Sequence, residues 1–116
     1  MNGAFLRFYT HEDRKVHGVL FYEWLLAEAK KLGIHGGTAF KAMAGFGRHG
    51  VVHEAKFFEL AGDLTVEVEF IVTDEEARKL IDVVREARMR VFYARVPAEF
   101  GVIEAGPRRL TATLRD

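Results

Sequence analysis

Glycine is concentrated in one short stretch of this chain. Residues 33–50 read GIHGGTAFKAMAGFGRHG and hold more than half of the glycines. Glycine weakens a helix or strand by about 0.5–1 kcal/mol relative to alanine, so such a cluster needs a conformational or a binding reason. Two readings stay open from the glycines alone. They form ordinary turns on either side of a short strand, or they let the backbone approach a ligand closely.

Histidines in and near the same stretch could hold a metal ion. His49 and His53 have HxxxH spacing, and His35 lies nearby in the sequence. In a loop or strand this spacing does not place both rings on one face, as a helix would, and no carboxylate completes a clear ligand set. We therefore expect no metal ion and keep a metal site at His49 and His53 as the second reading.

A third set of reactive side chains follows the first apolar run. Glu12 lies next to His11 and a few residues before His17. An acid/base pair could be built from them, but neither a nucleophile nor an oxyanion-binding group is recognisable. We expect an exposed charged connection, in which Glu12 orders the loop, and no catalysis. A small hydrolase or isomerase that uses Glu12 is the enzymatic alternative.

Composition narrows the class of protein. The chain has 116 residues, enough for one domain, and its 17 Lys and Arg balance 17 Asp and Glu. A neutral chain lacks the basic footprint of a duplex-binding protein, so we expect no nucleic-acid partner. The absence of cysteine excludes disulfides and thiolate metal sites. With no apolar leader and no run long enough to span a membrane, we expect a cytoplasmic protein.

Hydrophobic periodicity then predicts the elements that position these residues. Alternation predicts strands over 4–10, 64–72 and 91–96. A short apolar run between glycine pairs predicts another over 38–44, and residues 52–60 could also extend. Helical spacing predicts one helix over 19–32, stopped by Gly33, and a second from the capping residue Thr73 to Arg88. Pro97 is expected to end the last strand.

The order βαββαβ predicts the fold. Right-handed crossovers give an α+β, ferredoxin-like unit: a four-stranded antiparallel sheet with both helices on one face. The other face is then bare, although strands carry apolar residues on both sides. In a chain this short, the simplest way to cover that apolar face is contact with another copy of the chain, so we expect an oligomer.

Several motifs together resemble a known family. LGIHGGT followed by GFGRHG resembles the signature of PII-like signalling proteins, in which G-x-T opens the second strand and G-F-G-R marks the base of a long loop. LRFYTHED, VLFYEWLLAEAKKLG and DLTVEVEFIVTDEE look like the domain-of-unknown-function 190 branch. The resemblance covers about residues 5–100. It implies a homotrimer with a small-molecule site, for adenine nucleotides in relatives, between adjacent subunits.

The resemblance also implies roles for residues in the glycine stretch. Backbone amides at the first glycine pair, with one hydroxyl, would cradle a phosphate. The second pair would bend the chain into the loop, an arginine would offer a planar fork to phosphate, and an aromatic ring would anchor the loop base. A histidine would add a hydrogen bond. The nucleotide-binding residues expected on this basis are Gly36, Gly37, Thr38, Gly45, Phe46, Gly47, Arg48 and His53.

Departures from PII proteins proper narrow the expectation. REARMR leads directly into VFYARV, without the second glycine-rich loop and its lysine, which argues against a triphosphate and favours a monophosphate such as AMP. The loop also lacks the tyrosine that some PII proteins modify. We expect a regulatory domain over 1–106 with a tail over 107–116, which signals to a partner through residues 45–63. A membrane transporter is the partner that the branch implies. A metal-binding trimer and a ligand-free interaction protein are the alternatives.

Overall fold

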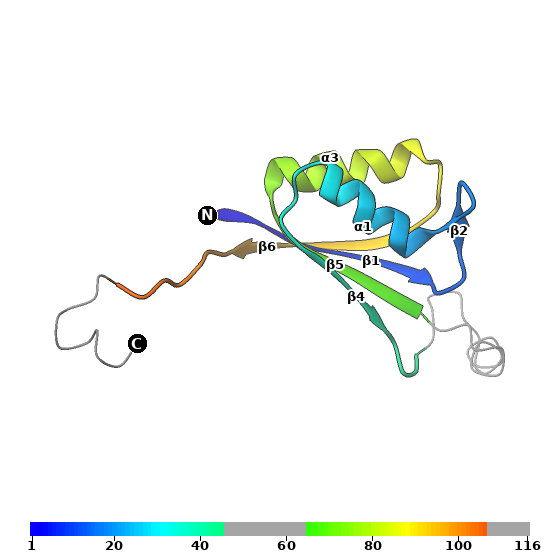
Figure 1. Ribbon diagram of the computed structural model, residues 1–116, viewed down its shortest axis with the longest axis horizontal. Helices are drawn as coiled ribbons and strands as arrows, with labels where there is room; N and C mark the ends of the chain where they lie inside the picture. Colours follow the sequence, from blue (N-terminus) through cyan, green and yellow to red (C-terminus); the bar gives the residue numbers. More distant parts are fainter. Residues whose placement is uncertain (46–64, 107–116) are drawn as a thin grey trace.

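The computed structural model describes residues 1–45 and 65–106. A four-stranded antiparallel sheet has the order β4-β5-β1-β6, built from β1 (Asn2–His11), β4 (Gly37–Lys41), β5 (Thr65–Thr73) and β6 (Phe92–Glu99). Helices α1 (Phe21–Lys31) and α3 (Asp74–Glu86) cover one face, and the other face carries no helix in the described part (Figure 1). The ferredoxin-like arrangement expected from the order of elements is confirmed.

The core lies between the sheet and the two helices. Leu6 and Phe8 on β1 alternate toward the helices and face Phe70 and Val68 on β5 across the strand pair. These four side chains are at most 1% exposed. From the helices, Phe21, Leu25, Ala29, Ala77, Leu80 and Val84 complete the core. The apolar residues that alternate over 64–72 therefore form the buried face of β5, as predicted.

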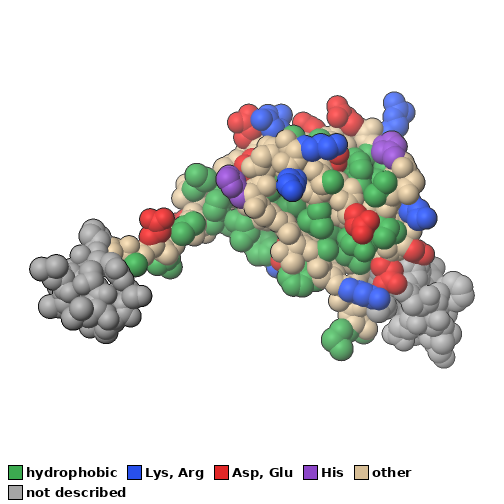
Figure 2. All heavy atoms as spheres, viewed as in Figure 1, with side chains coloured by type: hydrophobic (Ala, Val, Ile, Leu, Met, Phe, Trp, Pro, Cys, Tyr) green, Lys and Arg blue, Asp and Glu red, His purple; other side chains and the backbone are tan. Residues whose placement is uncertain are grey.

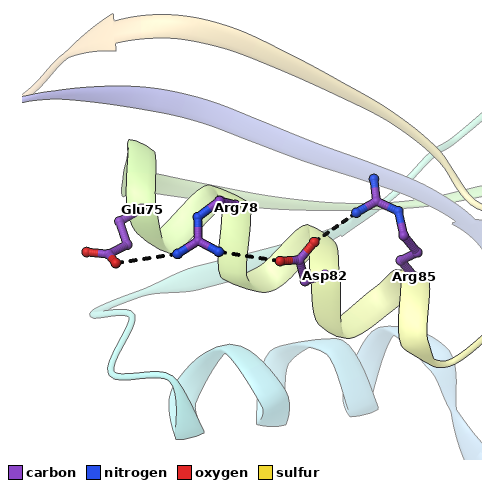
Figure 3. A network of polar contacts seen from close by, with 4 residues as sticks. All are labelled: Glu75, Arg78, Asp82 and Arg85. Atoms are coloured by element: carbon purple, nitrogen blue, oxygen red, sulfur yellow. Dashed lines mark hydrogen bonds and ion pairs between the residues drawn. The ribbon is translucent and has the colours of Figure 1, made fainter.

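Helix α3 begins with the capping box predicted at Thr73. The Glu76 amide donates to Thr73 Oγ1 at 3.2 Å, and the Thr73 amide donates to Glu76 Oε1 at 2.9 Å. The reciprocal bonds satisfy two donors that a helix start leaves open. The exposed face of the helix carries a chain of ion pairs in which Asp82 lies between two arginines (Figure 3).

The start of the first helix differs from the prediction. Val19 and Leu20 form the two-residue strand β3, paired with β2 (Lys15–Val16), and the helix begins only at Phe21. His17 and Gly18 both have positive φ, 52° and 78°, the geometry of a tight hairpin turn. Gly33, with φ of 84°, ends α1 as expected.

Two strand ends also differ. β4 stops at Lys41 rather than continuing to residue 44, and Pro97 lies inside β6 rather than at its end. Among the described strands, β6 lies at the edge of the sheet and pairs with β1 alone. A proline is compatible with an edge strand when its nitrogen faces away from the neighbouring strand, so the pairing continues past it. The possible extension of residues 52–60 lies outside the described residues.

No helix in the described part of the chain is long and apolar enough to cross a membrane.

Candidate functional site

The sheet face opposite the helices, here called the open face, is largely apolar. Cross-strand register places Phe5 beside Ile71 and Val96, and Tyr9 beside Phe92. Phe40, Ile71, Phe92 and Val96 are each about half exposed, at 51–54%. Figure 2 shows charged side chains along the helix side of the molecule, at the top of the view. The open face therefore presents apolar side chains from all four strands of the main sheet.

A charged cluster interrupts this apolar surface. Arg7 Nε lies 3.4 Å from Glu67 Oε1 and 3.5 Å from Glu69 Oε2. A hydrogen bond with Glu69, burial and the Glu69 charge raise the pKa of the Glu67 carboxyl, against the opposing effect of Arg7. A side-chain hydrogen bond with Tyr9 raises the pKa of Arg7, which stays cationic. Arg7, Glu67 and Glu69 are called the Arg7 cluster below.

A groove of about 920 Å³ lies at one end of the open face. It brings together the start of β4, the end of β5, the first turn of α3, the start of β1 and the segment after β6. Its lining residues are Met1, Phe5, His35, Gly36, Gly37, Thr38, Phe40, Glu69, Phe70, Ile71, Thr73, Glu76, Phe100, Gly101 and Val102.

The segment after β6 is held in place at the groove by the other end of the chain. The Met1 ammonium donates to the Phe100 carbonyl at 3.1 Å, and the Phe100 amide donates to the Met1 carbonyl at 3.0 Å. Gly3 leaves space for the Phe100 ring, because a Cβ on Gly3 would lie 2.8 Å from the ring atom Cε1. Beyond this anchor, residues 101–106 leave the body as an extended arm (Figure 1).

The lining divides into an apolar wall and a polar edge. Phe5, Phe40, Ile71, Phe100 and Val102 supply the wall, which suits a flat apolar group such as a purine base. At the polar edge, Thr38 and Glu69 are neighbours across the β4–β5 pair. Thr73 and Glu76 already bond each other in the capping box.

Charge in the groove is not arranged for a polyanion. Its described lining contains Glu69 and Glu76 but no lysine or arginine. The Met1 ammonium is engaged by the Phe100 carbonyl. A phosphate at this edge would therefore depend on backbone amides, on the Thr38 hydroxyl and on cations from outside the described lining.

Three residues of the predicted nucleotide site, Gly36, Gly37 and Thr38, line the groove together. Gly45 has open space around it at the end of the described segment. Phe46, Gly47, Arg48 and His53 lie outside the described residues, as does nearly all of the 45–63 loop. The structure thus brings together the first part of the predicted site, and the roles assigned to these residues stay predictions.

Gly36 and Gly37 differ in whether the surrounding structure leaves room for a side chain. A Cβ at Gly36 would meet nothing within 4 Å, whereas one at Gly37 would lie 2.7 Å from Phe70 Cδ1 and 3.0 Å from Leu26 Cδ2. Gly37 is therefore required by packing of the core. Of the two, Gly36 is the one that lines the groove without such a constraint.

Sequence reasoning missed the arm as part of this site. Phe100 and Val102 line the groove although they follow the last strand. The available signal was the apolar run Phe100 to Ile103, which lies beyond the expected end of the sheet. Nothing local in that run indicates that it lines the same groove as Gly36 and Thr38, because this placement depends on β6 lying beside β1.

The other candidate residues are placed as follows. Glu12 Oε2 lies 2.8 Å from Lys41 Nζ, so Glu12 ties the loop after β1 to the end of β4. His17 contacts the Trp24 ring edge-on at 6.4 Å between centroids. Within residues 1–45 and 65–106, no three His, Cys, Asp or Glu residues form a group able to hold a metal ion. His49 and His53 are outside these ranges.

The chain is similar in sequence to known proteins. Residues 3–95 match the DUF190 family, described as "Uncharacterized ACR". A UPF0166 protein of Aquifex aeolicus is 36% identical over 80 residues, which cover 69% of this chain and 76% of that protein. A UPF0166 protein of Methanocaldococcus jannaschii is 32% identical over 76 residues, 66% of this chain and 69% of that protein.

A solved structure shares the fold. The crystal structure of a protein described as PII-like in signalling, from Thermus thermophilus, superposes with a TM-score of 0.52 at 18% identity and covers 84% of this chain and 90% of that one. The sheet order, the two helices and this neighbour agree on a PII-like architecture. With a family match over most of its length, the chain belongs to the DUF190 family.

Proposed function

We propose that this protein is a PII-like regulatory protein that binds a small effector, an adenine nucleotide and most readily a monophosphate, between the subunits of a homotrimer. The observation that carries the proposal is the groove in which Gly36, Gly37 and Thr38 meet an apolar wall at the end of the open face. A subunit covering the open face would close the same groove, so the site is completed by assembly.

The division of the groove favours a mononucleotide. The apolar wall takes the base, and the Gly36 amide and the Thr38 hydroxyl take the phosphate, with Arg48 as the cation expected from the resemblance. The described lining has no lysine or arginine to neutralise further charges. Each additional phosphate therefore adds repulsion from Glu69 and Glu76 without a new partner.

Signalling is assigned to the 45–63 loop on the basis of the resemblance. An effector held beside Thr38 contacts the start of β4, and β4 leads directly into that loop. Occupancy would bias the loop toward one arrangement that a partner protein recognises. A membrane transporter is the partner proposed, and the protein acts as a sensor rather than an enzyme.

The first test is a thermal-unfolding screen of the purified protein against AMP, ADP, ATP, cyclic AMP, the guanine counterparts, inorganic phosphate and divalent metals. A ligand at a hundred times its dissociation constant stabilises a site by about 2.7 kcal/mol, enough to move the midpoint by several degrees. AMP is expected to give the largest shift, and chromatography should recover it unchanged.

Each other outcome of the screen selects a different reading. No shift with any nucleotide would refute the effector site and leave a protein that acts through contacts alone. A shift with metal only would promote the metal-binding trimer, and replacement of His53 by alanine should then remove the bound metal. Turnover of a nucleotide would refute the assignment as a sensor and direct attention to Glu12.

A further inference from the structure

The Arg7 cluster lies among apolar residues of the open face. Cross-strand register places Arg7 between Glu69 on β5 and Ala94 on β6, and Glu67 between Tyr9 on β1 and Phe40 on β4. The Arg7 guanidinium also lies over the Phe5 ring at 4.5 Å. Two carboxyl groups and one guanidinium group thus lie together in a surface that is otherwise largely apolar.

The geometry of the cluster leaves one carboxyl oxygen short of a donor. Glu67 Oε1 is shielded from solvent and has no hydrogen-bond partner among the described residues. Its ion-pair contact to Arg7 Nε, at 3.4 Å, is long. The hydrogen bond with Glu69 that raises the pKa of Glu67 needs a proton on one of the two carboxyls, because two ionised carboxylates can only accept.

Charge balance gives the same result. With all three groups ionised the cluster carries one cation and two anions, a net charge of −1 per chain. Removing such a cluster from water is costly unless its charges are balanced. One proton on the two carboxyls makes the cluster neutral and leaves Arg7 paired with a single carboxylate.

A second copy of the same chain is the occupant that the molecule itself favours for this face. The arm beyond Phe100 carries Val102 and Ile103, 84% and 100% exposed, while Phe40, Ile71, Phe92 and Val96 on the open face are half exposed. A protruding apolar segment and an apolar face on one chain are complementary features, which suits head-to-tail association of identical chains. Once the cluster is neutral, the covering chain does not have to supply a compensating charge.

We propose that a second copy of the chain covers the open face and that each covered face holds one proton shared between Glu67 and Glu69. The covering copy is the assembly already contained in the proposed function, on which this inference rests, and the proton is new. Assembly then takes up protons from solution.

The groups facing the carboxyl pair define where else a proton could go. On β1 these are Arg7 and Tyr9, with His11 one pair further along, opposite Thr65. From β4, Phe40 and Thr38 face the pair, and from β6 Ala94 and Phe92 face Arg7 and Tyr9. The Lys41–Glu12 ion pair lies at the end of β4. His11 is thus the second titratable candidate, and a variant separates it from the acids.

The sign of the linkage follows from burial. Covering the face disfavours the ionised carboxyls more than the protonated pair, so the assembled state binds more protons than the free chain. Association should therefore be tightest in acid and weaken as the pH rises above the ordinary range of a glutamate. The dissociation constant changes by about tenfold per pH unit for each proton taken up.

The experiment measures the assembly equilibrium of the whole chain by sedimentation equilibrium between about pH 3.5 and 8, a range that spans the ordinary pKa values of glutamate and histidine. If the complex does not dissociate at measurable concentrations, the rate of subunit exchange between tagged and untagged copies, followed by native mass spectrometry, gives the same comparison. Wild type should dissociate more readily as the pH rises. Glu67→Gln, which mimics the protonated acid, should assemble tightly and lose most of this dependence.

Two controls isolate the cluster. Glu75→Gln removes the same charge from the exposed surface of α3, where Glu75 pairs with Arg78, and it should keep the wild-type pH profile. His11→Gln should keep it too. A profile that is flat in wild type, opposite in sign, unchanged in Glu67→Gln or abolished in His11→Gln overturns the shared proton. A protein that is monomeric at every pH overturns the assembly itself, and the inter-subunit effector site with it.

Discussion

The ring of Phe70 occupies the space that a side chain at Gly37 would need. The two residues are register partners across β4 and β5, and the Phe70 side chain is 1% exposed in the core. Leu26 of α1 would also be in close contact with a Cβ at Gly37, at 3.0 Å from Cδ2. One glycine of the pair in the candidate site is thus explained by the core, which makes its neighbour the sharper probe of ligand binding.

Substitution of the two glycines should separate packing from binding. Gly37→Ala forces Phe70 or Leu26 to move and should destabilise the protein by about 1–3 kcal/mol, measured by urea unfolding. Gly36→Ala points into open space and should change stability by less than about 0.5 kcal/mol. If the Gly36 amide contacts the effector, Gly36→Ala should instead weaken nucleotide binding. Equal stability losses for both variants would contradict the packing argument.

The Thr38 hydroxyl should contribute to affinity and not to stability. Thr38→Val keeps the shape of the side chain, removes the donor, and is expected to weaken AMP binding by several-fold, as loss of one hydrogen bond of about 1 kcal/mol would. Thr65→Val is the matched control, because Thr65 lies on the same sheet face at the opposite end of β5. Calorimetric titration that finds equal affinities for the two variants would remove Thr38 from the site.

The arm offers a pair of adjacent residues for a similar comparison. Val102 lines the groove and Ile103 does not, although both are more than four-fifths exposed. Val102→Ser should weaken nucleotide binding with little change in the unfolding midpoint, because an exposed valine contributes little to the fold. Ile103→Ser should leave affinity for the nucleotide unchanged. The reverse order would show that the arm meets the ligand differently.

Folding stability should depend on pH through Glu67. Because the folded chain raises the pKa of Glu67, its contribution to stability is full at low pH and is lost as the pH rises through the raised value. Glu67→Gln lacks this loss, so the stability of the variant relative to wild type should increase from acid to neutral pH. Urea unfolding at a series of pH values and one protein concentration tests it, with Glu75→Gln as control. A constant difference would contradict the raised pKa.

The capping box makes a simpler prediction. Thr73→Ala removes the acceptor for the Glu76 amide and should cost about 1 kcal/mol in the free energy of unfolding. Thr73→Ser retains the oxygen and should be close to wild type. A Ser variant as unstable as the Ala variant would mean that the methyl group, rather than the hydrogen bond, is responsible.

The fold was predictable because its signals are local. Alternation in residues 64–72 follows the buried face of β5, the Thr73–Glu76 spacing starts α3, and Gly33 ends α1. The hairpin at His17–Gly18 was missed because apolar spacing in Val19 and Leu20 continues into the helix. The glycine at position 18 was the stronger turn signal, and in the structure His17 and Gly18 both have positive φ.

The site was only partly predictable because its walls come from distant segments. Glycine content marked Gly36 and Gly37 without revealing that Phe70 requires one of them. The placement of Phe100 and Val102 depends on strand order and on the bonds between Met1 and Phe100. Likewise, Glu67 and Glu69 read as the polar half of an alternating strand, and only the register with Arg7 makes them a cluster.

Pro97 has a bearing on how far an assembly of this chain can grow. It lies in β6, the outermost strand of the sheet beside β1, and it has no backbone N–H to offer an incoming strand. A β-strand from another chain that paired with the outer edge of β6 would lack one backbone hydrogen bond at Pro97. Open-ended growth of the sheet would use both of its described edges, β4 and β6, so a block at β6 disfavours a fibre built by strand addition.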